Sequence, residues 1–244
     1  MRIESMTVRS NDRIAKDVYR MKLVGNTRGI KRPGQFVNIK LDGFFLRRPI
    51  SVCHWTDEEL CIIYKVVGRG TEYMSRLASG KRLDIMMGLG NGFDLSKSGA
   101  NPLLIGGGVG TPPMYGLCRA LLQEGKMPIV ILGFNTADEI FLADDFARLG
   151  VKTIVTTVDG SAGIKGFVTD AMNLALDSTY FFACGPLPML KAVYEKSNTG
   201  GQLSFEERMG CGFGACMGCS CKTKYGNKRI CRDGPVLEKE EVIW

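Results

Sequence analysis

The chain has 244 residues, 45% of them hydrophobic, and a formal net charge of +7 at pH 7. Such a length corresponds to one large domain or two domains of ordinary size, with enough apolar residues for a substantial core. The basic residues are spread along the chain and do not form one cluster, so we expect no nucleic-acid partner. Phosphate-bearing cofactors and an acidic protein partner suit this charge better.

The nine cysteines do not form a disulfide framework. Four are scattered through apolar surroundings: Cys53, Cys61, Cys118 and Cys184. Charged residues interrupt every early apolar run, so we expect no secretory signal and a cytoplasmic location. The strongly apolar segments, such as 127–134, are far shorter than the roughly 20 residues of a membrane-spanning helix, so we expect no membrane partner.

The first part of the chain alternates short β-type runs with glycine turns. These runs occupy residues 5–10, 18–25, 34–41, 48–55, 60–68 and 82–90. Regular short strands separated by turn signals are typical of an antiparallel barrel or sandwich. We assign residues 1–97 to this β domain.

Two short motifs in the β domain carry groups that can bind phosphate. Arg48, Pro49, Ile50 and Ser51 lie in "RRPIS", and Gly70 and Thr71 lie in "GRGT". Either motif alone would be a charged turn, but a barrel could bring them together.

Between these two motifs, "IYK" supplies Ile63, Tyr64 and Lys65, an aromatic ring and a cation that could lie against a flat cofactor. His54, the only histidine, is interpreted as a partly exposed strand residue without a chemical task. No Ser/His/Asp or Cys/His arrangement is present, so we assign no catalytic residue.

From residue 98 to 202 the pattern changes to alternating strands and helices. After the strand–loop–helix unit at 101–125, strands are predicted at 127–134, 151–158 and 179–185, and helices at 137–150, 168–176 and 187–197. This alternation predicts a parallel sheet covered by helices, and hence a nucleotide-type α/β domain.

The glycine loop "IGGGVGTPP" connects a predicted strand to a predicted helix, the context that a phosphate-binding turn requires. Its candidate binding residues are Gly107, Gly108, Gly110 and Thr111. The loop does not match G-x-G-x-x-G in the usual way. A tight connection without a ligand is the alternative.

"ACGPLPML" ends the fourth strand of the same sheet, so Cys184 and Gly185 fall at the carboxyl edge where such sheets bind ligands. Paired with the glycine loop, they predict a nicotinamide contact; a buried core thiol is the alternative for Cys184. We favour NAD over NADP because segment 132–139 has no arginine for a 2′-phosphate and carries Asp138 and Glu139. Either acid could instead serve the following helix.

The last part, 203–244, is a small cysteine module with a strand-like end at 240–244. Its candidate ligands form C-x4-C-x2-C followed by a more distant cysteine: Cys211, Cys216, Cys219 and Cys231. The opening spacing is that of plant-type [2Fe–2S] ligands, and four nearby glycines let the backbone approach an anionic cluster. A structural zinc site is the alternative. Cys221 is interpreted as a packed or spare thiol.

Taken in order, the R-P-x-S, G-x-G-T, G-G-G-x-G and C-G-P motifs and the cysteine loop resemble the ferredoxin-reductase superfamily. More closely, segments 47–51, 105–117, 183–190 and 204–223 resemble the electron-transfer subunit of NAD-dependent (class 1B) dihydroorotate dehydrogenase. The resemblance covers nearly the whole chain, and the cysteine segment is its most specific part.

The resemblance implies an oxidoreductase subunit with FAD on the barrel, a [2Fe–2S] cluster in the cysteine module and NAD on the α/β domain. It also implies an FMN-containing catalytic subunit that oxidises dihydroorotate in pyrimidine biosynthesis, in a heterotetramer of two copies of each subunit. One alternative is an NAD(P)H reductase subunit of another complex, such as a hydrogenase. Another is a zinc-stabilised nucleotide-binding regulatory module.

Overall fold

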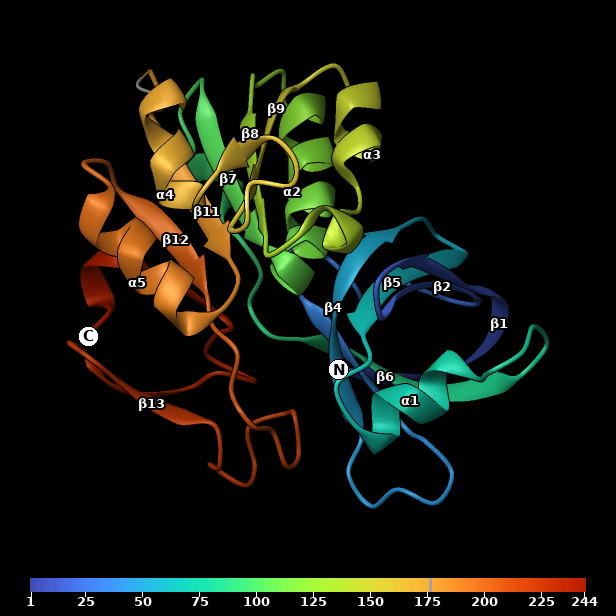
Figure 1. Ribbon diagram of the computed structural model, residues 1–244. Helices are drawn as coiled ribbons and strands as arrows, with labels where there is room; N and C mark the ends of the chain where they lie inside the picture. The colour runs from blue at the N-terminus through green and yellow to red at the C-terminus, as the bar shows by residue number, and fades with distance from the viewer. Residues whose placement is uncertain (176) are drawn as a thin grey trace.

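The computed structural model describes residues 1–175 and 177–244. The N-terminal part forms a closed antiparallel barrel in the strand order β1-β2-β5-β4-β3-β6 (Figure 1). The strands are β1 (Arg2–Ala15), β2 (Val18–Val24), β3 (Phe36–Ile39), β4 (Arg48–Trp55), β5 (Glu59–Lys65) and β6 (Arg82–Leu89). The six predicted β runs and the barrel are therefore confirmed.

The barrel closes because its strands place large apolar side chains inside. In β2, for example, Val18, Met21 and Leu23 are buried while their neighbours are partly exposed. Met21 and Leu23 fill the barrel interior together with Ile62 and Ile85. Val18 instead packs in the cluster shared with the α/β part. The barrel is thus a packed core, so a cofactor has to bind on its outer surface.

The second part is a seven-stranded sheet in the order β10-β9-β8-β7-β11-β12-β15. Its strands are β7 (Pro102–Gly107), β8 (Ile129–Phe134), β9 (Lys152–Thr157), β10 (Ile164–Lys165), β11 (Tyr180–Cys184), β12 (Gly201–Ser204) and β15 (Val236–Glu238). All neighbouring strands are parallel except β12 and β15. The predicted α/β fold is confirmed, with one antiparallel edge strand added.

Helices cover both faces of this sheet (Figure 1). They are α2 (Thr111–Gln123), α3 (Ala143–Arg148), α4 (Val168–Ala171) and α5 (Leu187–Lys196). Alternate residues of the central strands face opposite sides, so Leu104 packs with α2 and α3 while Ile105 packs with α4 and α5. This double burial explains why the strands have near-continuous apolar sequences.

Four local predictions differ from the structure. The "GRGT" motif begins a short helix, α1 (Arg69–Ser75), which was not predicted. The predicted helix at 137–150 is a 3₁₀ turn at Ala137–Glu139 followed by α3, because Leu142 has a φ of +63° and interrupts the helix.

The third and fourth differences concern segments 168–176 and 240–244. The helix predicted at 168–176 is α4 followed by a 3₁₀ turn at Met172–Ala175, and residue 176 lies outside the described residues. The predicted strand at 240–244 instead starts with the 3₁₀ turn Lys239–Glu241, where Glu241 accepts a hydrogen bond from the backbone of Glu238.

The barrel and the sheet pack directly against each other along β4 and α2. A Cβ atom on Gly116 of α2 would lie 2.5 Å from the carbonyl oxygen of Cys53 in β4. Arg20 of β2 also pairs with Asp145 of α3 at 3.0 Å. The two parts therefore hold a fixed surface between them.

The C-terminal module leaves the sheet after β12 and returns to it as β15. In between, β13 (Ser220–Thr223) and β14 (Gly226–Arg229) form a hairpin. The expected boundary at 202/203 falls inside β12, whereas the one at 97/98 falls before β7. Among the described residues, none of the helices has the length and hydropathy to cross a bilayer.

Candidate functional site

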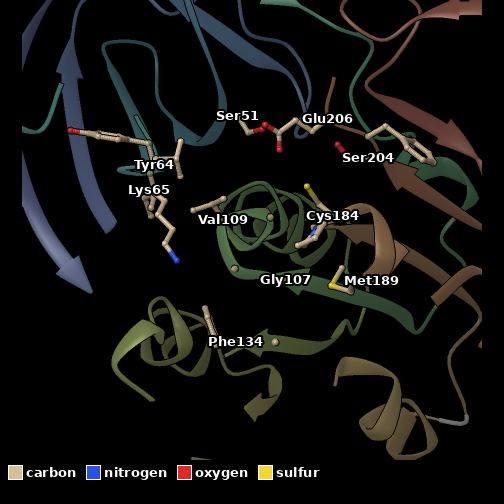
Figure 2. A pocket seen from close by; sticks show the side chains of 18 of the residues that line it. Ser51, Tyr64, Lys65, Gly107, Val109, Phe134, Cys184, Met189, Ser204 and Glu206 are labelled. Carbon is tan, nitrogen blue, oxygen red and sulfur yellow. The ribbon is translucent and has the colours of Figure 1, made fainter. Parts of the chain in front are cut away.

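A cavity of about 1130 Å³ lies between the barrel and the sheet (Figure 2). Every predicted cofactor-binding residue lines it except Thr111, which is fully buried beneath the glycine loop. The cavity thus unites the barrel motifs around Arg48 and Gly70 with the glycine loop and the end of β11. The motifs of the barrel and of the α/β part thus line one space.

The barrel side of the cavity holds a guanidinium group next to a short helix. A Cβ atom on Gly70 would lie 2.1 Å from Arg48 Nε, so the arginine packs directly over this glycine. The ring of Phe44 lies 4.6 Å from the Arg48 guanidinium and supports its other side. Thr71 Oγ1 accepts hydrogen bonds from the backbone N–H groups of Val67 and Gly68. These groups form a cationic corner suited to a phosphate.

Strand β5 borders the cavity, and its side chains alternate between the cavity and the barrel interior. The hydroxyl of Tyr64 donates to Asn11 Oδ1 at 2.8 Å, and its ring stacks on Tyr19 inside the barrel. Figure 2 shows the Tyr64 ring directed away from the cavity. Ile63 and Lys65 therefore flank the cavity on this strand, and Tyr64 contributes its backbone. The Tyr64 ring does not face the cavity in this structure. A contact between this ring and a flat cofactor therefore stays a prediction.

The glycine loop lines the cavity through Gly107, Gly108, Val109 and Gly110, and these positions differ in the space around them. Gly107 and Gly110 have no room for a Cβ, which would lie 2.3 Å from Met189 Sδ and 2.1 Å from the Cys184 carbonyl oxygen, respectively. Gly108, with a φ of +50°, has no atom within 4 Å of its Cβ position. Close packing explains two of the glycines, and Gly108 is the one that leaves open space for a ligand.

Cys184 lies at the carboxyl end of β11, beside the glycine loop. Its sulfur points into the cavity, on the side of Ser51 and Glu206 (Figure 2). Burial raises the pKa of the Cys184 thiol to about 12, with a smaller opposing effect from the hydrogen bond of Ser204. The group is therefore a neutral thiol at physiological pH and adds no charge to the site.

Several cavity residues were missed by sequence reasoning. They are Phe36, Phe134, Asn135, Met189, Phe205 and Glu206. Phe36, Phe134 and Phe205 look like ordinary core residues in the sequence. Glu206 lies five positions before Cys211. Its place between two motif segments was the one signal in the sequence that could have marked it as a cavity residue.

The two acids after β8 have different partners. Glu139 pairs with Lys65 of the barrel at 2.8 Å, and Asn135 Nδ2 donates to its other oxygen at 2.8 Å. The Lys65 ammonium, and then the Asn135 side chain, hold the pKa of Glu139 below its usual value although burial opposes them. Asp138 pairs with Lys16 at 3.3 Å, away from the cavity. Only Glu139 is thus placed to affect a ligand.

The four candidate cluster ligands lie as two pairs. The backbone N–H of Cys216 points at Cys211 Sγ, and that of Cys231 points at Cys219 Sγ, each at 3.4 Å. The part of the chain that the structure describes has no group of three or more Cys, His, Asp or Glu side chains arranged around a single ion. Four cysteine thiolates are the ligand set of a plant-type [2Fe–2S] cluster and also of a structural zinc site.

Backbone amides already favour a charged sulfur at the first ligand. Burial raises the pKa of the Cys211 thiol, but the backbone N–H groups of Cys216, Phe213 and Ala215 outweigh it and lower the pKa to about 6. Such amides stabilise thiolates in iron–sulfur loops. The donor set therefore fits the cluster better than a set of inert thiols.

Close contacts hold the cysteine loop against the barrel and the hairpin. A Cβ atom on Gly212, which has a φ of +78°, would lie 2.3 Å from Nδ2 of the buried Asn38. On the other side, Arg229 donates to the Gly214 carbonyl at 2.9 Å and pairs with Asp233 at 3.0 Å. The loop is thus supported from β3 and β14.

Two family models match the chain. The iron–sulfur cluster binding domain of dihydroorotate dehydrogenase B matches residues 206–243, and the oxidoreductase NAD-binding domain matches residues 104–195. The first match contains all four candidate cluster ligands, and the second contains the glycine loop and Cys184. The matched segments coincide with the cysteine module and the α/β part of the structure.

Curated relatives align along the whole chain. The electron transfer subunit of dihydroorotate dehydrogenase B (NAD(+)) from Fusobacterium nucleatum is 45% identical, covering 99% of this chain and 99% of its own. The protein with the same name from a Geobacillus strain is 41% identical, covering 100% and 99%.

Solved structures share the fold. A structure of NADH-dependent reduced ferredoxin-NADP oxidoreductase, studied for flavin-based electron bifurcation, superposes with a TM-score of 0.89 at 32% identity, over 98% of this chain and 90% of its own. A ferredoxin NADP+ reductase from Neisseria gonorrhoeae superposes with a TM-score of 0.69 at 15% identity, over 80% and 90%.

Proposed function

Because the chain belongs to the family of electron transfer subunits of dihydroorotate dehydrogenase B, we propose that it connects a catalytic partner subunit to NAD+. The partner carries FMN and oxidises dihydroorotate, and two copies of each subunit form a heterotetramer. No residue of this chain contacts dihydroorotate in this scheme. The observation that carries the proposal is the single cavity lined by both the barrel motifs and the glycine loop.

Three groups are proposed, on residues whose chemistry fits them. FAD lies against Ile63 and the backbone of Lys65 with phosphate at Arg48 and Gly70, NAD lies along Gly108 and Cys184, and [2Fe–2S] takes the four cysteines. NAD exchanges two electrons as a hydride and the cluster exchanges one, and a flavin exchanges either number, which is the chemistry that FAD supplies.

The residues of this chain bind and orient these groups. Arg48 offers a guanidinium that is held in place by Gly70 and the Phe44 ring, so little freedom is lost when it meets a phosphate. The neutral Cys184 thiol keeps the polar edge of the cavity free of a charge that would oppose hydride transfer. Amides directed at Cys211 and Cys219 disperse the negative charge of the cluster sulfurs.

The domain division remains part of the proposal. Residues 1–97 bind FAD, residues 98–202 bind NAD and residues 203–244 bind the cluster. The shared cavity between barrel and sheet supports the first two, and the loop from β12 to β15 supports the third.

A different reductase partner is the rival function, and the likeness to the NADH-dependent reduced ferredoxin-NADP oxidoreductase favours it at the level of fold. The higher identity of the dihydroorotate dehydrogenase relatives favours our proposal. The match of the iron–sulfur cluster binding model to residues 206–243 argues against the zinc-stabilised module.

The test is a visible absorption spectrum with iron and sulfide analysis on anaerobically purified protein, before and after adding NADH. We expect flavin bands and two irons and two sulfides per chain, bleached by NADH. Zinc without flavin would overturn the proposal. Dihydroorotate-dependent reduction of NAD+ after co-expression with the FMN subunit then separates it from the rival.

A further inference from the structure

The ion pair between Lys65 and Glu139 crosses the cavity from the barrel to the sheet. Lys65 ends β5, and Glu139 ends the 3₁₀ turn after β8. Their side chains are 33% and 16% exposed, so the pair is partly shielded from water. Figure 2 shows Lys65 extending from the barrel toward Phe134, the last residue of β8. Both charged groups therefore face the part of the cavity formed by the α/β domain.

Lys65 is the one cation on that side among the described residues that line the cavity. The other two lining cations are Arg48 and Arg69, which belong to the corner around α1. The loops after β8 and β9 contribute apolar and neutral residues to the cavity, together with Glu139. The net charge on the α/β side of the cavity therefore depends on whether Lys65 is neutralised.

Glu139 is fixed as a counterion on both of its oxygens. Oε1 accepts from Lys65 at 2.8 Å, and Oε2 accepts from the Asn135 side chain at 2.8 Å and from the Asn135 backbone at 3.3 Å. The carboxylate cannot turn away without losing these bonds. It therefore keeps the Lys65 ammonium paired and lowers the attraction that this cation offers to a phosphate.

We propose that Glu139 is a positioning and specificity-determining residue: by neutralising Lys65 it disfavours coenzymes that carry a 2′-phosphate. This inference rests on the proposed function. A 2′-phosphate adds about two negative charges, so it gains most from an unpaired ammonium and is opposed most by a carboxylate. The NAD preference thus comes from a counterion that spans two domains, and not from a direct contact of the acid with the ribose alone.

The test is calorimetric titration of the FAD-loaded protein with ADP-ribose and with its 2′-phosphorylated form, at low salt. In Glu139→Gln we expect the preference for ADP-ribose to fall by roughly tenfold, mostly through tighter binding of the phosphorylated ligand. In Lys65→Met/Glu139→Gln the preference should return toward the wild-type value, because the cation is gone. With NADPH and an artificial acceptor, Glu139→Gln should lower KM with kcat unchanged.

Asp138→Asn is the matched control. It removes the same charge one residue earlier, from an ion pair with Lys16 whose two side chains are 55% and 58% exposed and lie outside the cavity. It should leave the ligand preference at the wild-type value. An equal change in Asp138→Asn and Glu139→Gln, or no change in Glu139→Gln, would overturn the inference.

Two further outcomes are separable. If Glu139→Gln does not fold, Lys65→Met gives the answer from the other side: an unneutralised Glu139 should make the preference for ADP-ribose larger, and an unchanged preference would refute the inference. If the wild-type protein binds neither ADP-ribose nor NAD+, the proposed function itself fails. Binding of ADP-ribose with no effect of any substitution leaves the proposed function intact and removes only this inference.

Discussion

Gly116 on α2 and Cys53 on β4 are in backbone contact: a Cβ atom on the glycine would lie 2.5 Å from the cysteine carbonyl oxygen. This contact sets the distance between the barrel and the sheet, and hence the width of the cavity that both line. A carbonyl oxygen in a strand cannot move aside as the end of a side chain can.

Gly116→Ala should destabilise the protein. Alanine at an exposed helix position would add about 1 kcal/mol of stability, but overpacking against a backbone atom costs about 1 to 3 kcal/mol. We expect the clash to dominate, with a lower free energy of unfolding measured by urea denaturation of the FAD-loaded protein. A more stable variant would show that α2 and β4 can separate without cost.

Gly70→Ala should weaken FAD binding without unfolding the barrel. Its Cβ would lie 2.1 Å from Arg48 Nε, and a flexible arginine can swing away at the expense of its position. Losing a charge-assisted hydrogen bond of about 1.5 to 3 kcal/mol corresponds to roughly 10- to 100-fold weaker binding. The measurement is the FAD dissociation constant on reconstitution.

Gly68→Ala is the control for this change. Gly68 has an extended φ of 179° and no atom within 4 Å of its Cβ position, so alanine fits there. Gly68 also lines the cavity, but alanine there leaves Arg48 in place, so FAD affinity should fall less than in Gly70→Ala. Similar losses in both variants would mean that the chain path, and not Arg48, limits binding.

Cys216→Ser should lose the cluster and keep the flavin. Cys216 is exposed, and its backbone N–H points at Cys211 Sγ, so serine would remove one of the four proposed ligands without touching the core. We expect iron and sulfide content to fall to near zero, with FAD and NADH-to-dye activity retained. Electron transfer to the partner should fail.

Cys221→Ser provides the comparison, in the hairpin that follows the cysteine loop. Cys221 lies on β13, outside the four cysteines proposed as ligands. This variant should retain its iron. Cluster absorbance that survives in Cys216→Ser, or disappears in Cys221→Ser, would show that the ligands are assigned to the wrong cysteines.

His54 should make stability depend on pH near neutrality. Burial, and then the nearby Arg119, lower its pKa from the usual 6.5. Because the unfolded chain binds the proton more readily, this contribution to stability is present above pH 6.5 and is lost as the pH falls through that value. His54→Gln should flatten the slope between pH 7 and 5.5 in thermal melts. The single imidazole resonance in a proton NMR titration gives the folded-state pKa directly, and a value at or above 6.5 would contradict the prediction.

The barrel and the parallel sheet were predictable because their signals are local. Alternation in β2 and the switch to apolar strands followed by helices need only short windows of sequence. The cysteine spacing and the glycine loop likewise point to their chemistry without tertiary information. Their placement around one cavity appears only in the structure, because it depends on how the barrel packs against the sheet.

The parts that were not predictable depend on contacts between distant segments. Leu142 interrupts a helical pattern because the chain adopts a left-handed conformation there, which no glycine announces. The direction of the Tyr64 ring depends on Asn11, which lies on another strand and accepts a hydrogen bond from the Tyr64 hydroxyl. The pairing of Lys65 with Glu139 joins residues that are 74 positions apart.

The cysteine module has its two ends side by side on the sheet. Ser204 pairs with Val236, and the N–H of Phe205 donates to the Pro235 carbonyl at 2.9 Å, so residues 205–235 form a loop whose base is closed by the sheet itself. Removing such a loop leaves two neighbouring strand ends that a short turn can join. The module can therefore be removed or exchanged as one piece, because its two ends already meet on neighbouring strands of the sheet.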